Sequence, residues 1–225
     1  MRQGFFGRFE FGFHDAASSA ARLGKATLFG LTLVIGGATT QAQTLASLPS
    51  ATQPIERNGA AKPVAAWLDF CKRYPDECAV NTAEPATVEL TAATWNTIVS
   101  VNKRVNARIK PVTDQVHWGI VDRWDFPDDG SGDCEDFQLL KRKILVERGL
   151  PRRALRMTVV IDEQGEGHAV LMVRTDRGDY ILDNKTNAVL PWAQTGSVFV
   201  TREGQESSAW GSLGGLTSPV TTANR

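Results

Sequence analysis

The sequence predicts an α+β domain, with helices in the first half of the chain and an antiparallel sheet in the second. From residue 64 to residue 148, apolar residues recur mostly at helical spacing. Beyond Pro151 the pattern changes to short β-branched runs, joined by links of hairpin length. Cys134 stands near the end of the helical half, at the point where a glycine loop turns into the last of the expected helices.

The first 42 residues have the features of a secretory signal peptide. Arg22 and Lys25 precede an apolar run at 26–38, and small residues follow at 40–42, where a signal peptidase would cleave. We therefore predict a signal peptide at 1–42 and a periplasmic location. The apolar run is shorter than the ~20 residues that a bilayer-spanning helix needs, and an uncleaved anchor is the alternative.

The remaining chain has the length and composition of one domain. Of the 225 residues 42% are hydrophobic, and the sequence has no internal repeat. We expect a linker at 43–62, the folded domain at 63–201 and a flexible tail at 202–225. The tail is rich in Ser, Gly and Thr, and Trp210 is its one residue that could dock on the domain.

The charge distribution argues against nucleic acid as a partner. The chain has 25 basic and 25 acidic residues, and loss of residues 1–42 removes four and two of them, which leaves a net charge of −2. No basic block is large enough to form a phosphate-binding face.

Export would place the three cysteines in an oxidising compartment, where thiols within reach of each other become paired. Cys71 and Cys78 bracket a short segment, and a disulfide there would add about 2.5 kcal/mol by the chain-entropy relation. Cys134 is then the odd thiol, which in an exported protein indicates a reactive group or intermolecular pairing. A buried, inert cysteine is the alternative.

The elements follow from the spacing of apolar residues. Helices are expected at 64–74, 91–109 and 134–148, the last ended by Gly149. Residues 112–132, which include Trp118 and Trp124, should form a loop across the surface in front of Cys134, where a substrate groove could lie. Antiparallel strands are expected at 155–161, 168–174 and 179–182, with a weaker one at 197–200.

A cysteine at a helix start lies near unpaired backbone N–H groups, which favour the thiolate. Asp133, Glu135 and Asp136 oppose this, since at about 6 Å each carboxylate would disfavour the thiolate by roughly 1–3 kcal/mol. Either these side chains turn away as ordinary helix-start residues, or a divalent cation gathers some of them. Oxygen ligands of this kind suit calcium.

His168 and Asp183 complete a candidate Cys-His-Asp triad of nucleophile, base and orienting carboxylate. If 175–178 is a four-residue hairpin loop, Arg174 faces Asp179 and His168 lies diagonal to Asp183 on one face of the sheet. A three-residue loop would break this arrangement. His117 is a rival base, and Asp183 could instead cap the turn before the following residue.

Three motifs together resemble the bacterial transglutaminase-like cysteine proteinases. They are Gly-Asp-Cys-Glu-Asp-Phe at 132–137, Gly-His-Ala-Val-Leu at 167–171 and Leu-Asp-Asn at 182–184, with support from the Phe-Cys…Pro-Asp-Glu-Cys segment at 70–78. The similarity covers about residues 63–200. It implies a papain/transglutaminase-like core in which Cys134 is the nucleophile, His168 the general base and Asp183 the orienting carboxylate.

The resemblance also implies that Asp133 and Glu135 help to bind calcium. Members of this family include periplasmic proteases that release large surface adhesins and are held by a membrane receptor for cyclic di-GMP. It thus implies a protein substrate, of which an adhesin is one form, and an inner-membrane receptor as a further partner.

The sequence therefore predicts an exported cysteine endopeptidase that acts through an acyl-enzyme. It contains no GxSxG elbow, HExxH helix, phosphate loop or CxxC pair that would indicate other chemistry. One rival is a transglutaminase or amidase with the same triad, and another is a calcium-dependent binding module with an inert thiol.

Overall fold

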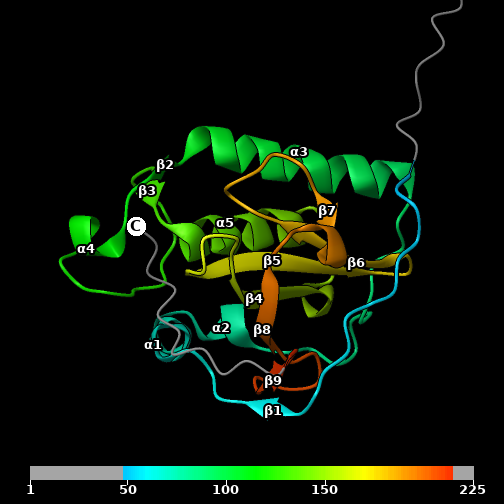
Figure 1. The fold of residues 1–225 in the computed structure, drawn as a ribbon, viewed down its shortest axis with the longest axis horizontal. Helices are drawn as coiled ribbons and strands as arrows, with labels where there is room; N and C mark the ends of the chain where they lie inside the picture. The colour runs from blue at the N-terminus through cyan, green and yellow to red at the C-terminus, as the bar shows by residue number, and fades with distance from the viewer. Residues whose placement is uncertain (1–47, 215–225) are drawn as a thin grey trace, which may run out of the picture. The chain divides into compact units, whose positions relative to one another are not determined.

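The computed structural model describes residues 48–214, which form a mixed helix and sheet domain (Figure 1). The main sheet has the strand order β1-β9-β8-β4-β5-β6-β7, and every neighbouring pair is antiparallel. Its strands are β1 (Ala60–Ala61), β4 (Leu155–Ile161), β5 (Gly167–Thr175), β6 (Gly178–Leu182), β7 (Leu190–Pro191), β8 (Val198–Glu203) and β9 (Trp210–Ser212). The expected α+β class with an antiparallel sheet is confirmed.

The α-helices of residues 48–214 are α1 (Ala65–Arg73), α2 (Pro75–Cys78), α3 (Ala92–Arg108), α4 (Asp114–His117) and α5 (Cys134–Glu147), and two short parallel strands, β2 (Lys110–Pro111) and β3 (Ser131–Gly132), lie before α5. The three longer helices, α1, α3 and α5, lie where the apolar spacing predicts them, whereas the short helices α2 and α4 were not predicted, and α4 lies within the expected loop at 112–132. Thr91 caps α3, because its side chain accepts a hydrogen bond from Thr94 N at 3.1 Å. Gly149 ends α5 with a φ of 89°, a left-handed conformation that favours glycine.

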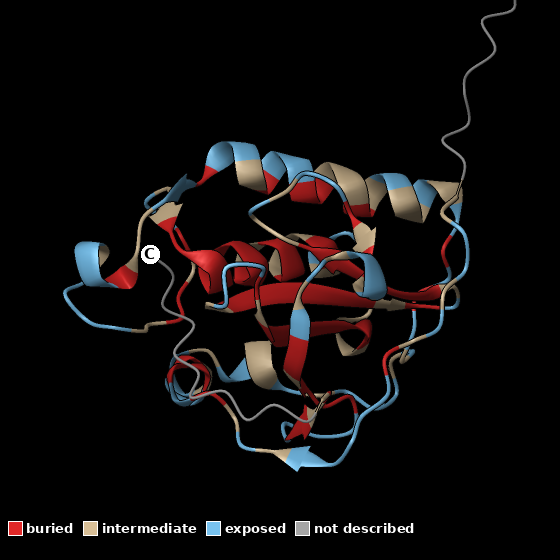
Figure 2. Ribbon diagram, viewed as in Figure 1, coloured by how far each residue is buried: buried red, intermediate tan, exposed pale blue. Residues whose placement is uncertain are grey.

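The core lies between the sheet and the helices. Helices α3 and α5 pack on each other and cover one face of the sheet, with α5 against β4 and β5 (Figure 1). Figure 2 shows α5 and the central strands as the most completely buried elements. The opposite face has a smaller apolar cluster around Val170 and Met172, which Ile55 and Leu213 help to cover. No helix among residues 48–214 is long and apolar enough to cross a membrane.

Cys71 and Cys78 form a disulfide, as the sequence predicts, with their Cα atoms 5.6 Å apart. The bond joins the end of α1 to α2 and fixes the turn between them. Among the described residues Cys134 is the cysteine that forms no disulfide, and it is buried.

Both predicted domain boundaries need correction where the structure describes them. The expected tail at 202–225 is wrong for residues 202–214, because β8 runs on to Glu203 and Trp210 is completely buried in β9. The expected linker at 43–62 is wrong for residues 48–62, because β1 pairs with β9 and Ile55 is buried. The predicted signal peptide, residues 43–47 and the end of the tail lie outside the described residues.

Candidate active site and acidic cluster

Cys134 is the first residue of α5, and it lies against the beginning of β5. Its Sγ is 3.4 Å from the backbone nitrogen of Ala169, which donates a hydrogen bond to it. The thiol in turn donates to Glu135 Oε2 at 3.1 Å. Only 1% of the residue is exposed. The nucleophile motif and the histidine motif therefore meet at one point in the fold.

The surroundings of Cys134 favour the thiol over the thiolate. Burial raises the pKa of the thiol well above its usual value, and the negative charges of Glu135 and Asp133 raise it further. The hydrogen bond from Ala169 N acts in the opposite direction but does not outweigh them. Burial first, and the two carboxylates second, therefore oppose the thiolate, so the conflict that the sequence indicated is present in the fold.

His168 and Asp183 are joined directly. His168 Nε2 and Asp183 Oδ1 are 2.8 Å apart. The hairpin has the register on which this expectation depended, since Arg174 is paired with Asp179 and Leu171 with Leu182. Nε2 is thus the ring nitrogen that faces the carboxylate, and Nδ1 lies on the other side of the imidazole.

Asp183 makes both of the contacts considered for it, one with His168 and one with the turn that follows. Besides the ring of His168, its Oδ1 accepts a hydrogen bond from Lys185 N at 2.9 Å, which caps the turn after β6. Burial acts to raise the pKa of Asp183, but the hydrogen bond and charge of His168, the Lys185 N–H and the charge of Lys141 together hold it below its usual value. The carboxylate is therefore ionised at neutral pH.

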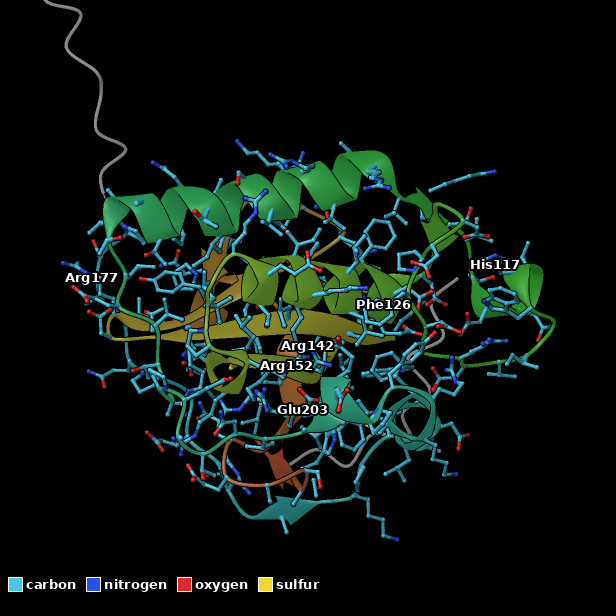
Figure 3. All side chains as sticks on the ribbon, turned by 180° about the vertical axis from the view of Figure 1, so that it is seen from behind. His117, Phe126, Arg142, Arg152, Arg177 and Glu203 are labelled. Atoms are coloured by element: carbon cyan, nitrogen blue, oxygen red, sulfur yellow. A yellow bond between two sulfur atoms is a disulfide. The ribbon has the colours of Figure 1, made fainter. Side chains whose placement is uncertain are left out.

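His117, the rival base, has a different environment. It lies on α4, in a segment that projects from the body of the domain (Figure 3). Its Nε2 is 2.8 Å from Asp129 Oδ2, and its ring stacks on Trp118 with 4.0 Å between ring centres. These contacts stabilise the projecting segment. They do not join His117 to the cysteine motif at 132–137.

Carboxylates gather beside Cys134 in two overlapping groups whose oxygen atoms lie within 4.8 Å of one another. One group is Asp114, Asp122 and Glu135, and the other is Asp114, Asp133 and Asp136. The structure thus brings both predicted metal ligands, Asp133 and Glu135, into an acidic cluster. The sequence analysis missed Asp114 and Asp122, and it did not assign Asp136 to the metal.

The electrostatics of this cluster fit a cation. One buried oxygen of each of Asp114, Asp133 and Glu135 has no hydrogen-bond partner within residues 48–214. Burial and the charge of Asp133 raise the pKa of Asp114 to about 7, and burial with nearby carboxylates raises that of Glu135 well above its usual value. Unpaired, desolvated carboxylate oxygens are the donors that a hard cation such as calcium prefers.

Backbone and glycine geometry hold the cluster together. Asp133 is the N-cap residue of α5, yet its side chain makes no capping hydrogen bond and its Oδ2 instead accepts one from Asp114 N at 3.1 Å. Asp136 Oδ1 accepts from Asp125 N at 2.8 Å. A Cβ on Gly132 would lie 2.6 Å from Asp136 Oδ2, so the close approach of this carboxylate depends on glycine.

A polar pocket of about 330 Å³ opens beside Asp183. Its lining includes Asp162 and Lys185, which form an ion pair, together with Glu163 and Ser197. Helix α4 and the segment that follows it expose four large apolar residues, Val116, Trp118, Ile120 and Val121. In contrast to Trp118, Trp124 of the predicted surface loop is completely buried.

The chain was compared with known proteins, and residues 56–217 match the family model of the bacterial transglutaminase-like cysteine proteinase BTLCP. Among solved structures it is similar to Legionella pneumophila LapG in its calcium-bound form, with 28% identity over 48% of this chain and 64% of that chain, at a TM-score of 0.43. The EGTA-treated form gives 29% identity over 48% and 62%, at the same TM-score. The aligned part is thus less than two thirds of the length of these relatives. A search of curated proteins finds no match. Because the family model covers most of its length, the chain belongs to the bacterial transglutaminase-like cysteine proteinases.

Proposed function

We propose that this protein is an exported cysteine endopeptidase whose triad is Cys134, His168 and Asp183. One observation carries the proposal: Ala169 N contacts Cys134 Sγ, while the adjacent His168 is hydrogen-bonded to Asp183. The thiol thus lies beside the residue that follows the imidazole, and the imidazole contacts the carboxylate, which supports an assignment to thiol catalysis. Membership of the proteinase family supports the same assignment.

The reaction follows from these roles. His168 Nδ1 takes the proton of the Cys134 thiol, and the thiolate sulfur bonds to the carbonyl carbon of the substrate. The peptide C–N bond then breaks as His168 returns the proton to the leaving amine, and a thioester remains. A water molecule, deprotonated by His168, attacks the thioester and releases the acid and the free thiol. Asp183 keeps the Nε2 proton in place throughout.

The negative charge on the carbonyl oxygen needs hydrogen-bond donors. The backbone N–H of Cys134 is the first donor that we propose, because the first N–H groups of a helix have no partner within it. We place the second donor in the loop between Trp118 and Trp124. Because His168 protonates the amine, the leaving half of the substrate exits on the His168 side, toward the pocket beside Asp183.

We further propose that calcium binds to Asp114, Asp122, Asp133, Glu135 and Asp136. The unpartnered buried oxygens of three of these residues support this, and a LapG structure of 28% identity is calcium-bound. When bound, calcium supplies positive charge that offsets the carboxylates beside the thiol. Asp133 and Asp136 themselves join the start of α5 to the preceding segment, because they accept hydrogen bonds from Asp114 N and Asp125 N.

The periplasm is the proposed location, because the first 42 residues have the pattern of a signal peptide and a disulfide suits an oxidising compartment. A protein substrate follows from the family. A large surface adhesin as substrate, and an inner-membrane receptor as regulator, rest on the family resemblance alone. Capture of periplasmic proteins by the Cys134→Ala variant, with wild type as control, would test both.

The decisive experiment compares wild type and Cys134→Ala on a mixture of unfolded proteins and peptides, with products identified by mass spectrometry. New amino termini that only the wild type generates support the endopeptidase. Cleavage by Cys134→Ala would rule out this nucleophile, provided that both proteins melt cooperatively at similar temperatures. Crosslinked or deamidated glutamines without chain scission would support the transglutaminase or amidase. Calcium binding without any reaction would support the binding module.

A further inference from the structure

Lys141 is a buried lysine that the reaction above does not use. It lies on α5, none of its surface is exposed, and its Nζ has no hydrogen-bond partner within residues 48–214. Nζ lies 5.9 Å from the centre of the Phe137 ring. Burying an ammonium group without a hydrogen-bond partner costs several kcal/mol, so packing alone does not account for a lysine at this position.

The next residue on α5 shows how the protein accommodates a structural cation. Arg142 is equally buried, but its Nη1 is 2.8 Å from Glu203 Oε2, and its Nη2 donates to Glu77 O at 3.1 Å. Figure 3 shows Arg142 and Glu203 close together. Lys141 has no such direct partner among the described residues, so its charge acts at longer range.

The position of Lys141 on the helix relates it to the active site. Cys134, Gln138 and Lys141 are spaced at i, i+4 and i+7 and therefore form one stripe along α5. Cys134 contacts the start of β5 through Ala169, and Gln138 Nε2 lies 3.3 Å from Asn184 Oδ1. The stripe thus runs along the segments that carry His168 and Asp183.

Asp183 is the charged group that acts on Lys141. Burial lowers the pKa of Lys141 to about 7, and the attraction of the Asp183 carboxylate opposes this change. Three residues lower the pKa of Asp183: His168 by its hydrogen bond and charge, Lys185 through its backbone N–H, and Lys141 by its charge. The ammonium group of Lys185 is paired with Asp162.

We propose that Lys141 is a positioning residue that acts through Asp183, as an internal counter-cation for the carboxylate that orients His168. The inference rests on the proposed function only in that Asp183 is taken as the orienting group. Below about pH 7, where Lys141 is protonated, its ammonium group offsets part of the loss of hydration around Asp183 and helps to keep the carboxylate ionised. Its Oδ1 then continues to accept the His168 Nε2 proton while Nδ1 exchanges a proton with the thiol.

Lys141→Met tests this proposal, because it removes the charge and keeps most of the length of the side chain. Below pH 7, where Lys141 is charged, we expect kcat to fall at least tenfold with KM changed less than twofold, while the melting temperature stays the same or rises. Arg142→Met is the matched control on the adjacent position. It removes the ion-pair partner of Glu203, so its melting temperature should fall, with kcat per folded molecule changed less than threefold.

A second measurement does not require a substrate. The His168 Nε2 proton, hydrogen-bonded to Asp183, should give a low-field proton NMR signal that is absent from His168→Gln. On acidification, Lys141→Met should lose this signal at a pH at least half a unit higher than wild type, because Asp183 takes up a proton more readily without the cation. The signal in Arg142→Met should follow wild type.

Two results would overturn the role of Lys141. One is an unchanged low-field signal and unchanged kcat in Lys141→Met. The other is a lower melting temperature with normal kcat per folded molecule, which would make Lys141 structural. If wild type cleaves nothing, the endopeptidase proposal fails, and the NMR comparison still decides whether Lys141 acts on Asp183.

Discussion

Arg142 and Glu203 form an ion pair that is enclosed by protein, with Nη1 and Oε2 2.8 Å apart. Glu203 also accepts hydrogen bonds from Trp67 Nε1 at 2.6 Å and from Met157 N at 2.9 Å. Burial acts to raise the pKa of Glu203, but Arg142 and Arg156 hold it below its usual value. This one carboxylate therefore joins α1, β4 and α5 to the end of β8.

Glu203→Gln should strongly destabilise the fold, because it leaves the buried guanidinium of Arg142 without its counter-charge. Breaking a buried pair from one side typically costs about 3–5 kcal/mol in the free energy of unfolding. Urea denaturation measures the change. Glu206→Gln is the control, since Glu206 pairs with Arg153 at the surface and should contribute about 0–1 kcal/mol. Equal losses in both variants would contradict the structural role of Glu203.

Gly132→Ala should weaken calcium binding while the sheet stays folded. The added Cβ would lie 2.6 Å from Asp136 Oδ2 and 2.7 Å from Asp136 Cβ, so the carboxylate has to move. Displacement of a ligand or its support commonly lowers metal affinity by about 10–100-fold. Isothermal titration with calcium measures this, with Ser131→Ala as the control on the same strand. Unchanged affinity would remove Asp136 from the proposed ligands.

Calcium should raise the melting temperature, and EGTA should reverse the effect, because a ligand that binds only the folded state adds about 2.7 kcal/mol at 100 times its dissociation constant. Asp122→Asn should reduce this stabilisation, since Asp122 belongs to one of the acidic groups. Asp128→Asn, on an exposed residue of the same loop, should leave it intact. An undiminished calcium effect in Asp122→Asn would exclude that residue as a ligand.

Lys141 should make stability depend on pH between about 7 and 10.5. Its pKa in the fold is about 7 against a usual value of 10.5, so in this window the unfolded chain holds a proton that the folded chain has released. Stability should therefore rise with pH there, by at most about 1.4 kcal/mol per pH unit, and be flat below pH 7 with respect to this group. The difference in unfolding free energy between wild type and Lys141→Met isolates the effect. If the difference in unfolding free energy stayed constant from pH 7 to pH 10.5, the pKa of Lys141 would not be lowered in the folded protein.

The longer elements could be predicted because their residues repeat with a clear period. The run at 155–161 coincides with β4, and Thr91 begins α3 as the polar residue before an apolar stripe. The short strands β1 and β9 could not be found in this way, because two or three residues show no periodicity. Gly and Ser around Trp210 therefore suggested a tail, although the tryptophan is buried against Trp67 and Trp124.

The candidate triad could be placed from the sequence because hairpin pairing relates His168 to Asp183 by simple counting. The acidic cluster could be found only in part. Asp133 and Glu135 flank the cysteine in the sequence. Asp114 and Asp122 come from the region at 112–132 that was predicted as a loop, and the spacing of residues does not predict the path of a loop. Lys141 gave no signal at all, since a lysine in an amphipathic helix is ordinarily at the surface.

Strand β9 lies along β8, with β1 outside it, so these short strands cover the backbone of a long central strand. A chain that stopped before Trp210 would leave the N–H and C=O groups of Thr201–Glu203 that face β9 without partners, while β4 would still pair with the other side of β8. Exposed strand edges recruit strands from other molecules. We therefore expect a chain without its last described residues to self-associate more readily.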